Sequence, residues 1–253
     1  MPIQLRNPHS VEAILKTRPK DVVHLNLSSK ASATAWEKVE KLGKELRIPI
    51  SFGAVSEKDA RSPRPSSLKQ TKDDSRQGGS HATVKERASV SLEELFRNAR
   101  DRNQGKGLWL ALDQLQDPHN LGAIFRSAAF FGVQGIILTQ ERSAPLSSTV
   151  YDVASGGVEY VPFVMQPNLK QALEFAKEAG AWILGTSEHA HDPMRSVALD
   201  RPWLLVLGNE ESGLRRLTEE SCDVLCSIPS SGKIGSLNVA VSAGIMISYL
   251  SGS

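Results

Sequence analysis

The chain has 253 residues, 40% of them hydrophobic and 23% charged, which excludes a disordered protein and allows a substantial core. It has no apolar run of the ~20 residues a membrane helix needs and no signal-peptide core, so we predict a cytoplasmic protein without a membrane partner. The net charge of +2 is uneven. Residues 1–107 hold 21 Lys and Arg against 13 Asp and Glu, while residues 108–253 hold 9 against 15. The basic front part is therefore predicted to contact a polyanion.

Residues 1–56 are predicted to form a small α/β domain that binds an RNA substrate. Apolar periodicity predicts helices over 7–18 and 31–47, and alternation predicts strands over 21–27 and 48–52. Each lysine of this segment by itself is best read as a solvated surface residue. Only their sum favours nucleic acid.

Residues 57–90 are predicted to be a flexible linker. The stretch 57–89 contains no Ile, Phe, Trp or Tyr, so it cannot bury a core of its own. Its basic residues are able to touch a phosphate backbone, but plain disorder is the favoured interpretation. A short helix over 92–102 is expected to lead into the last domain.

The domain predicted for 91–253 alternates strands with helices. This order indicates an α/β fold with a mostly parallel sheet and helices on both faces. Open sheets of this kind bind ligands at the C-terminal ends of their strands. The predicted strands are 108–112, 135–139, 161–164, 181–186, 203–207 and 224–228. The predicted helices are 121–131, 147–155, 169–179, 214–221 and 237–250.

Two strand ends in the middle of this domain lead into polar loops. The stretch 113–128 reads D-Q-L-Q-D-P-H-N-L-G-A-I-F-R-S-A. There we expect Asn120 to cap a helix and Arg126 to lie off its apolar stripe, free to face a site. The stretch 207–214 reads L-G-N-E-E-S-G-L and forms a glycine-flanked acidic turn.

The stretch 228–250 opens with I-P-S-S-G-K-I-G-S-L-N-V and ends in a helix that is apolar almost all round. Such a helix should be buried against a sheet or a partner chain. Gly232 and Gly235 allow close backbone approach, and Ser236 is the expected N-cap, with Asn238 beside it. The pattern indicates a small-molecule pocket, with an ordinary strand–turn–helix corner as the alternative.

The sequence gives only weak evidence for a metal site, a redox site or a nucleotide-binding loop. His189 and His191 form H-x-H without a credible third ligand, so no metal is predicted. Cys222 and Cys226 cannot complete a zinc set, which favours a reduced protein. Neither G-x-G-x-x-G nor G-x-x-x-x-G-K-[ST] occurs, so a dinucleotide oxidoreductase is disfavoured.

In order and spacing, D-x-x-x-D-P-x-N-x-G-x-x-x-R-S-A, L-G-N-E-x-x-G and I-P-x-x-G-x-x-x-S-L-N-V resemble motifs 1, 2 and 3 of the SPOUT-class (TrmH-type) RNA 2′-O-ribose methyltransferases. The resemblance covers roughly 108–250. It implies S-adenosylmethionine as cofactor, a trefoil knot in the C-terminal domain and an active site completed across a homodimer.

Within that family the chain most resembles the branch that methylates a guanosine ribose in large-subunit rRNA. Members of that branch carry a small N-terminal domain of the L30e-like type, which fits the elements predicted for 1–56. The branch that acts on a tRNA guanosine lacks this domain and is the first alternative. A catalytically silent RNA-binding relative is the second.

Carried over position by position, the resemblance assigns catalytic roles to Asn120, Arg126, Glu210, Ser236 and Asn238. It assigns contacts with the cofactor to a second set: Leu207, Gly208, Asn209, Ile228, Gly232, Ser236 and Leu237. No metal ligand is implied.

The role of Arg126 is open between two hypotheses. The family resemblance implies that it assists deprotonation of the ribose hydroxyl. A guanidinium keeps its proton at neutral pH, so we favour phosphate binding and stabilisation of the developing alkoxide, with Asn120 and Glu210 orienting the groups. The structural alternatives are that Asn120 and Ser236 are only helix caps and that Glu210 pairs with Arg215 or Arg216.

Overall fold

Two units with separate cores make up the chain, Met1–Glu86 and Arg87–Ser253. The computed structural model describes residues 2–28, 34–53, 79–209 and 212–252.

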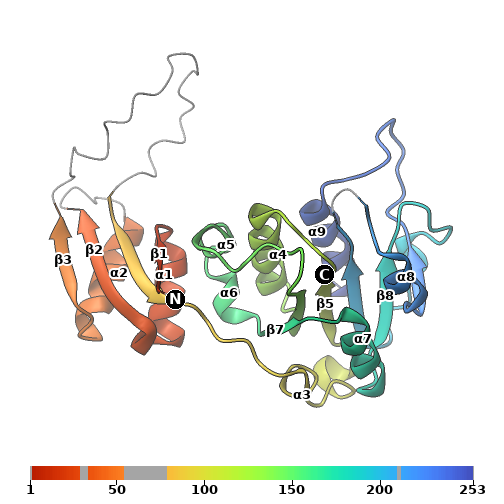
Figure 1. Cartoon of the computed structure of the whole chain (residues 1–253), viewed down its shortest axis with the longest axis horizontal. Helices are drawn as coiled ribbons and strands as arrows, with labels where there is room; N and C mark the ends of the chain where they lie inside the picture. Colours follow the sequence, from red (N-terminus) through yellow and green to blue (C-terminus); the bar gives the residue numbers. More distant parts are fainter. Residues whose placement is uncertain (1, 29–33, 54–78, 210–211, 253) are drawn as a thin grey trace. The chain divides into compact units, whose positions relative to one another are not determined.

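The N-terminal unit is a four-stranded sheet with two helices (Figure 1). The strand order is β1-β4-β2-β3, with β2 and β3 parallel and β4 antiparallel to both of its neighbours. Its core includes the fully buried Leu5, Ile14, Leu25 and Val39. The strands are β1 (Pro2–Leu5), β2 (Val22–Ser28), β3 (Ile50–Gly53) and β4 (His81–Lys85), and the helices are α1 (Pro8–Thr17) and α2 (Thr34–Glu45). The two helices and two strands predicted for this region are therefore present.

Strand β4 corrects the predicted linker. We expected 57–90 to lack structure, but His81–Lys85 pairs with β1 on one side and β2 on the other. Ala82 and Val84 alternate with polar residues and are fully buried. Composition missed this strand because its partners lie far away in sequence. Residues 57–78 of the predicted linker lie outside the described residues.

The C-terminal unit holds a six-stranded sheet in which each described strand pair is parallel. The order is β10-β8-β9-β5-β6-β7. The strands are β5 (Leu108–Leu112), β6 (Gly135–Thr139), β7 (Phe163–Gln166), β8 (Trp182–Thr186), β9 (Trp203–Leu207) and β10 (Val224–Cys226). The helices are α3 (Leu92–Leu95), α4 (Pro118–Phe130), α5 (Ser148–Ala154), α6 (Gly157–Tyr160), α7 (Leu169–Glu178), α8 (Arg216–Glu220) and α9 (Val239–Leu250). The predicted α/β fold with a mostly parallel sheet is confirmed.

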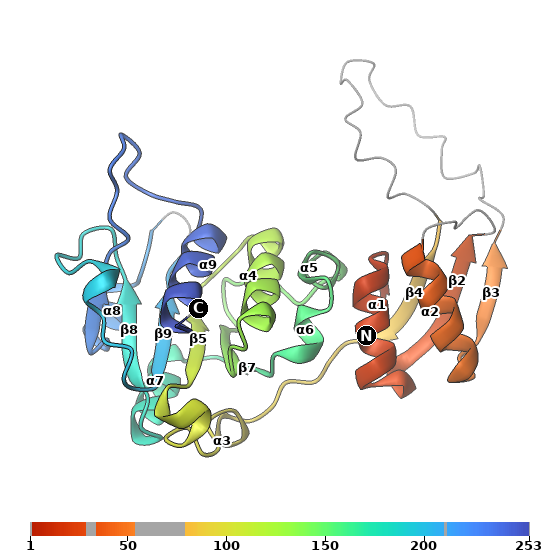
Figure 2. The ribbon, with the colours of Figure 1, turned by 180° about the vertical axis from the view of Figure 1, so that it is seen from behind.

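Helices cover both faces of this sheet, as the opposite views in Figures 1 and 2 show. Trp109 and Ala111 of β5 lie in a cluster of buried residues with α3 and α7. The alternate residues of the same strand turn to the other face, where α4 and α9 pack together. A strand buried on both faces reads as a continuous apolar run, which is why L-W-L-A-L was recognisable in the sequence.

Two of the differences between predicted and observed helix boundaries in this unit have a clear local cause. Helix α4 begins at Pro118, three residues early, because the Asp117 side chain accepts a hydrogen bond from the His119 N–H at 2.9 Å and caps it. The helix expected over 92–102 ends at Leu95, since Asn98 and Asn103 adopt positive φ and cannot continue it.

None of the helices within the described ranges is both long and apolar enough to span a membrane.

Cys222 precedes β10 and Cys226 is its last residue. Burial raises the pKa of the Cys222 thiol to about 12 and that of the Cys226 thiol to about 11. Each thiol therefore stays protonated at pH 8, where an unfolded thiol near its ordinary pKa of 9.0 ionises in part. We expect a disulfide reagent at pH 8 to label neither cysteine of the folded protein and both in denaturant, as counted by absorbance. Rapid labelling of the native protein would contradict this account of the thiols.

Candidate active site

The carboxyl ends of four neighbouring strands meet at one edge of the sheet. In register, Leu112 of β5 pairs with Leu207 of β9, and Cys226 of β10 pairs with Thr186 of β8. β5 and β9 also flank the point at which the strand order reverses, where parallel sheets bind their ligands. The loops that carry the three motifs follow β5, β9 and β10, so they gather at this edge.

The first and third motifs touch through two asparagines. The Asn238 side-chain amide donates a hydrogen bond to the Asn120 side-chain oxygen at 2.9 Å. Asn120 is only 8% exposed, in the first turn of α4. The two residues lie 118 positions apart in sequence, and the fold brings them together.

Asn238 also starts the last helix. Its side-chain oxygen accepts hydrogen bonds from the N–H groups of Ala240 at 2.9 Å and Val241 at 3.3 Å. The prediction that Ser236 caps this helix is therefore wrong, as is the start at 237: α9 begins at Val239 and Ser236 lies exposed in the preceding loop. The prediction that Asn120 caps α4 is wrong too, because Asp117 occupies that position.

The last helix is only partly buried. Ala243, Met246 and Ile247 are completely buried, and the helix packs against α4 and β9. Val241 is 50% exposed near its start. We expected this apolar helix to be buried all round, but only one of its faces is buried.

The described residues of the second motif's loop 208–215, which are 208–209 and 212–215, are held close together. Asn209 and Gly213 exchange backbone hydrogen bonds of 3.0 Å in both directions. A Cβ on Gly208 would come within 2.2 Å of the Gly213 backbone, so this position requires glycine. Leu207 before it is buried at the end of β9. The side chain of Asn209 donates to the Gln114 carbonyl at 2.9 Å and therefore holds the loop to the first motif.

The third motif's loop, 227–238, offers backbone groups and apolar side chains at the surface. Ile228 is half-buried, Leu237 is 51% exposed and Ile234 is 77% exposed. A Cβ on Gly232 would meet only the Ile234 N, at 4.0 Å. Protein packing therefore does not require glycine at position 232, and the prediction that a ligand approaches the backbone closely there stays open to test.

Gly232→Ala tests this assignment. We expect an unchanged melting temperature, because the added methyl has room, and at least a tenfold weaker binding of S-adenosylhomocysteine by calorimetry. Gly208→Ala is the steric control, and it should lower both the melting temperature and the affinity. Unchanged affinity in Gly232→Ala would remove Gly232 from the cofactor site.

Of the other predicted catalytic residues, Arg126 lies away from the two asparagines. Arg126 is exposed on α4, about 240° around the helix from Asn120 and about 9 Å along it. Glu210 lies outside the described residues. Its suggested partners Arg215 and Arg216 contact Asp113 and Glu220, and a pairing of either arginine with Glu210 stays a prediction.

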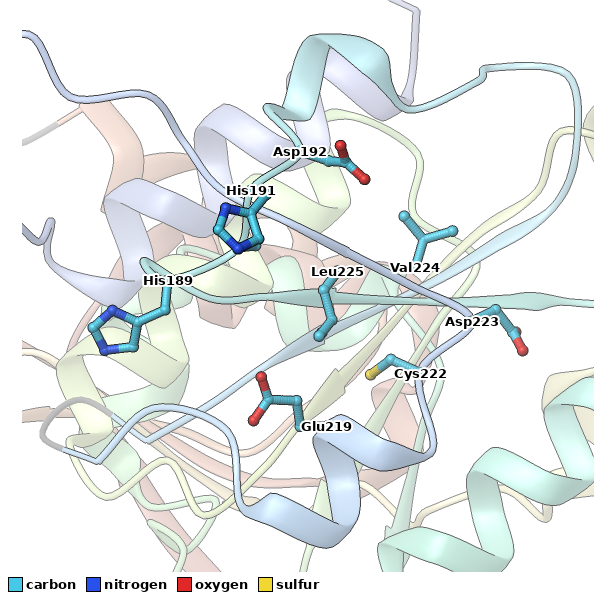
Figure 3. Close-up of a pocket in the computed structure, with 9 residues that line it drawn as sticks. His189, His191, Asp192, Glu219, Cys222, Asp223, Val224 and Leu225 are labelled. Atoms are coloured by element: carbon cyan, nitrogen blue, oxygen red, sulfur yellow. The ribbon is translucent and has the colours of Figure 1, made fainter.

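A pocket of about 450 Å³ lies beside β10 (Figure 3). His189 and His191 line it from the loop after β8, and Glu219 and Cys222 line it from the side of α8. None of the predicted cofactor residues contributes to its wall. Within the part of the chain that the structure describes, no group of three or more His, Cys, Asp or Glu is arranged to hold a metal ion.

Comparison with known proteins decides the family. Residues 107–248, more than half of the chain, match the SpoU rRNA Methylase family. The chain belongs to this family. This confirms the resemblance found in the three motifs, since all three lie inside the matched range.

Relatives of this SpoU chain share its sequence over different lengths. The 23S rRNA (guanosine-2′-O-)-methyltransferase RlmB of Nitrosomonas europaea is 47% identical over 171 residues, which are 68% of this chain and 64% of that protein. The same-named protein of Pseudomonas aeruginosa is 36% identical over 94% of this chain and 92% of its own length.

A solved structure matches nearly the whole SpoU chain. The SpoU methyltransferase AviRb from Streptomyces viridochromogenes aligns with a TM-score of 0.76 at 20% identity, over 99% of this chain and 88% of that one. At this identity the likeness establishes the fold.

One polar residue of this SpoU site was not singled out in the sequence. Asp113 follows β5 directly, its side chain is fully buried, and it forms an ion pair with Arg215. Asp113 is the first residue of motif 1. An acidic residue directly after a predicted buried strand was the sequence signal that could have identified it.

Proposed function

We propose that this chain transfers a methyl group from S-adenosylmethionine to the 2′-hydroxyl of a guanosine ribose in large-subunit rRNA. The observation that carries the proposal is the Asn120–Asn238 contact at the switch point of the sheet, within a chain of the SpoU family. Two relatives that share its sequence carry the name of this activity.

The loops after β9 and β10 suit the cofactor. Exposed Ile234 and Leu237 offer apolar contact for an adenine ring, and the open backbone at Gly232 offers hydrogen-bonding groups. When bound, S-adenosylmethionine supplies an electrophilic methyl group. The residues proposed to hold it are Leu207, Gly208, Asn209, Ile228, Gly232, Ser236 and Leu237.

The chain's own residues must then orient the ribose and stabilise the charge that develops on its oxygen. The linked amides of Asn120 and Asn238 form a rigid polar surface, because each is also fixed to the start of a helix. Positioned donors of this kind stabilise developing negative charge without reorganising. Arg126 is proposed to bind the adjacent phosphate and add a positive charge.

Arg126 reaches this site most simply from a second copy of the chain. It is exposed and turned away from Asn120 of its own protomer, while Phe130 on α4 is 83% exposed and Val241 on α9 is 50% exposed. We propose a homodimer that covers these apolar side chains and places Arg126 of each protomer at the partner's site.

Other parts of the family resemblance stay predictions: the trefoil knot, the L30e-like character of the N-terminal domain, RNA binding by that domain and a cytoplasmic location. A tRNA guanosine substrate and a catalytically silent RNA binder are the competing functions. The basic N-terminal unit favours the rRNA substrate, because it supplies an additional surface for a polyanion.

Methyl transfer from labelled S-adenosylmethionine separates these functions. We expect incorporation into unmethylated large-subunit rRNA and none into tRNA. Label in tRNA alone would favour the tRNA branch. Binding of S-adenosylhomocysteine and rRNA without transfer would identify the silent relative.

A further inference from the structure

We infer that Asp113 and Arg215 are positioning residues that hold the loop 208–215 in the conformation that binds the cofactor. The inference rests on the proposed function, since it assigns this loop to the cofactor. Neither residue is expected to touch the cofactor or the reacting atoms.

The pair has the geometry of a specific clamp. Arg215 Nη2 lies 2.7 Å from Asp113 Oδ1, and Arg215 Nε donates to Asp113 Oδ2 at 3.0 Å. The Thr218 hydroxyl donates to the same Oδ2 at 2.8 Å. Nη2 approaches Oδ1 as an ion pair without hydrogen-bond geometry, so buried Oδ1 has no hydrogen-bond partner among the described residues. The directed bond from Nε to Oδ2 still fixes the orientation of the planar guanidinium, which a lysine ammonium cannot reproduce.

The pair joins two loops that are far apart in sequence. Asp113 extends β5, and its backbone N–H donates to the Leu207 carbonyl at 2.9 Å, so the carboxylate is anchored to the sheet. Arg215 ends the loop 208–215 and precedes α8. The side chain of Asp113 has no exposed surface, whereas that of Arg215 is 47% exposed. The arginine therefore brings its loop to a fixed carboxylate.

Asn209 ties the other end of the same loop. Its side-chain N–H donates to the Gln114 carbonyl at 2.9 Å, and its oxygen accepts from the Ser212 N–H at 3.2 Å. Both ties lead to adjacent residues after β5. The loop is thus held at each end, and the acidic pair Glu210 and Glu211 lies between the two ties in the sequence.

Loss of one tie should free the loop without removing a cofactor contact. A loop released at one end populates further conformations, and the cofactor then binds only the fraction that keeps the competent one, which weakens the apparent affinity in proportion. The pair should therefore act on cofactor affinity and leave RNA affinity unchanged, because the loop that Arg215 holds carries the proposed cofactor residues Gly208 and Asn209.

The test compares Arg215→Ala and Arg215→Lys with Arg216→Ala in the full-length protein. Arg216 is the matched control: it is the next residue, its side chain is 78% exposed, and within the described part of the chain it pairs with Glu220 of its own helix. Calorimetry with S-adenosylhomocysteine, well below each melting temperature, gives the affinity. Steady-state kinetics give KM for S-adenosylmethionine and for RNA separately.

We expect the affinity for S-adenosylhomocysteine to fall about 10- to 100-fold in Arg215→Ala, which corresponds to a competent loop fraction of about 1–10%, with KM rising for S-adenosylmethionine and not for RNA. Arg215→Lys should lie between this variant and the wild type, and Arg216→Ala should equal the wild type. If Arg215→Ala does not fold, Arg215→Lys decides by the same criterion.

Folded Arg215 variants with wild-type affinity and KM, even at a lower melting temperature, would show a merely structural pair and overturn the inference. A wild-type protein that binds no S-adenosylhomocysteine would instead overturn the proposed function, and the inference with it. The two failures are therefore distinguishable.

Discussion

The Asn238→Ser protein should fold like the wild type and lose about a hundredfold in methyl transfer. Serine is as good an N-cap as asparagine, so it can replace the hydrogen bonds to Ala240 and Val241. It is too short to reach Asn120, so the amide contact at 2.9 Å is lost. Removing one positioned donor from a transition-state site has an effect of this size in other enzymes.

Asn238→Ala separates the two roles of the residue. Alanine removes the cap as well as the amide, so the free energy of unfolding should fall by about 1 kcal/mol relative to Asn238→Ser. The rate of methyl transfer should be equally low in Asn238→Ser and Asn238→Ala, because both lack the amide. Urea titration and single-turnover transfer measure the two effects. An Asn238→Ser protein with wild-type transfer would leave Asn238 as a helix cap alone.

Arg126→Ala should abolish most of the activity and leave stability unchanged. The side chain is exposed, so its removal makes no cavity. The positive charge proposed to stabilise the alkoxide is lost, and we expect a fall of at least a hundredfold in kcat. Arg97→Ala, which removes another exposed arginine from the same unit, is the matched control and should keep full activity.

Mixing variants tests whether Arg126 acts on the partner's site. Arg126→Ala and Asn238→Ser proteins, inactive alone, should regain about a quarter of wild-type activity after unfolding and refolding together, since half of the dimers are mixed and each has one intact site. No recovery, although mixed dimers form, would mean that Arg126 acts within its own protomer. A monomeric wild type in light scattering would contradict the proposed dimer itself.

Elements with strong local signals were predicted well from the sequence. The strands of the large sheet are short apolar runs, such as Leu108–Leu112, in which each residue is buried. The interior strand β4 was missed because only two of its five residues are buried and its partners β1 and β2 are distant in sequence.

The site likewise divides into features with a local sequence signal and features that depend on distant residues. The motifs located the correct loops, but Ser236 and Asn238 are both preferred N-cap residues, and local sequence does not choose between them. In the structure Asn238 is the N-cap, and it is also the residue that contacts Asn120, 118 positions away in sequence. The Asp113–Arg215 pair spans 102 positions and was likewise invisible in any local pattern. The Asp117 cap was readable, because Asp followed by Pro is a common helix start.

The most direct test of the central claim is the position of the transferred methyl group. Unmethylated large-subunit rRNA is labelled with the wild-type protein and with Asn238→Ser, then hydrolysed in alkali and analysed by nucleotide. We predict label in alkali-resistant dinucleotides that begin with guanosine, strongly reduced for the variant, because a methylated 2′-oxygen cannot attack the neighbouring phosphate. Label in single nucleotides or on a base would contradict ribose methylation and the account of this site.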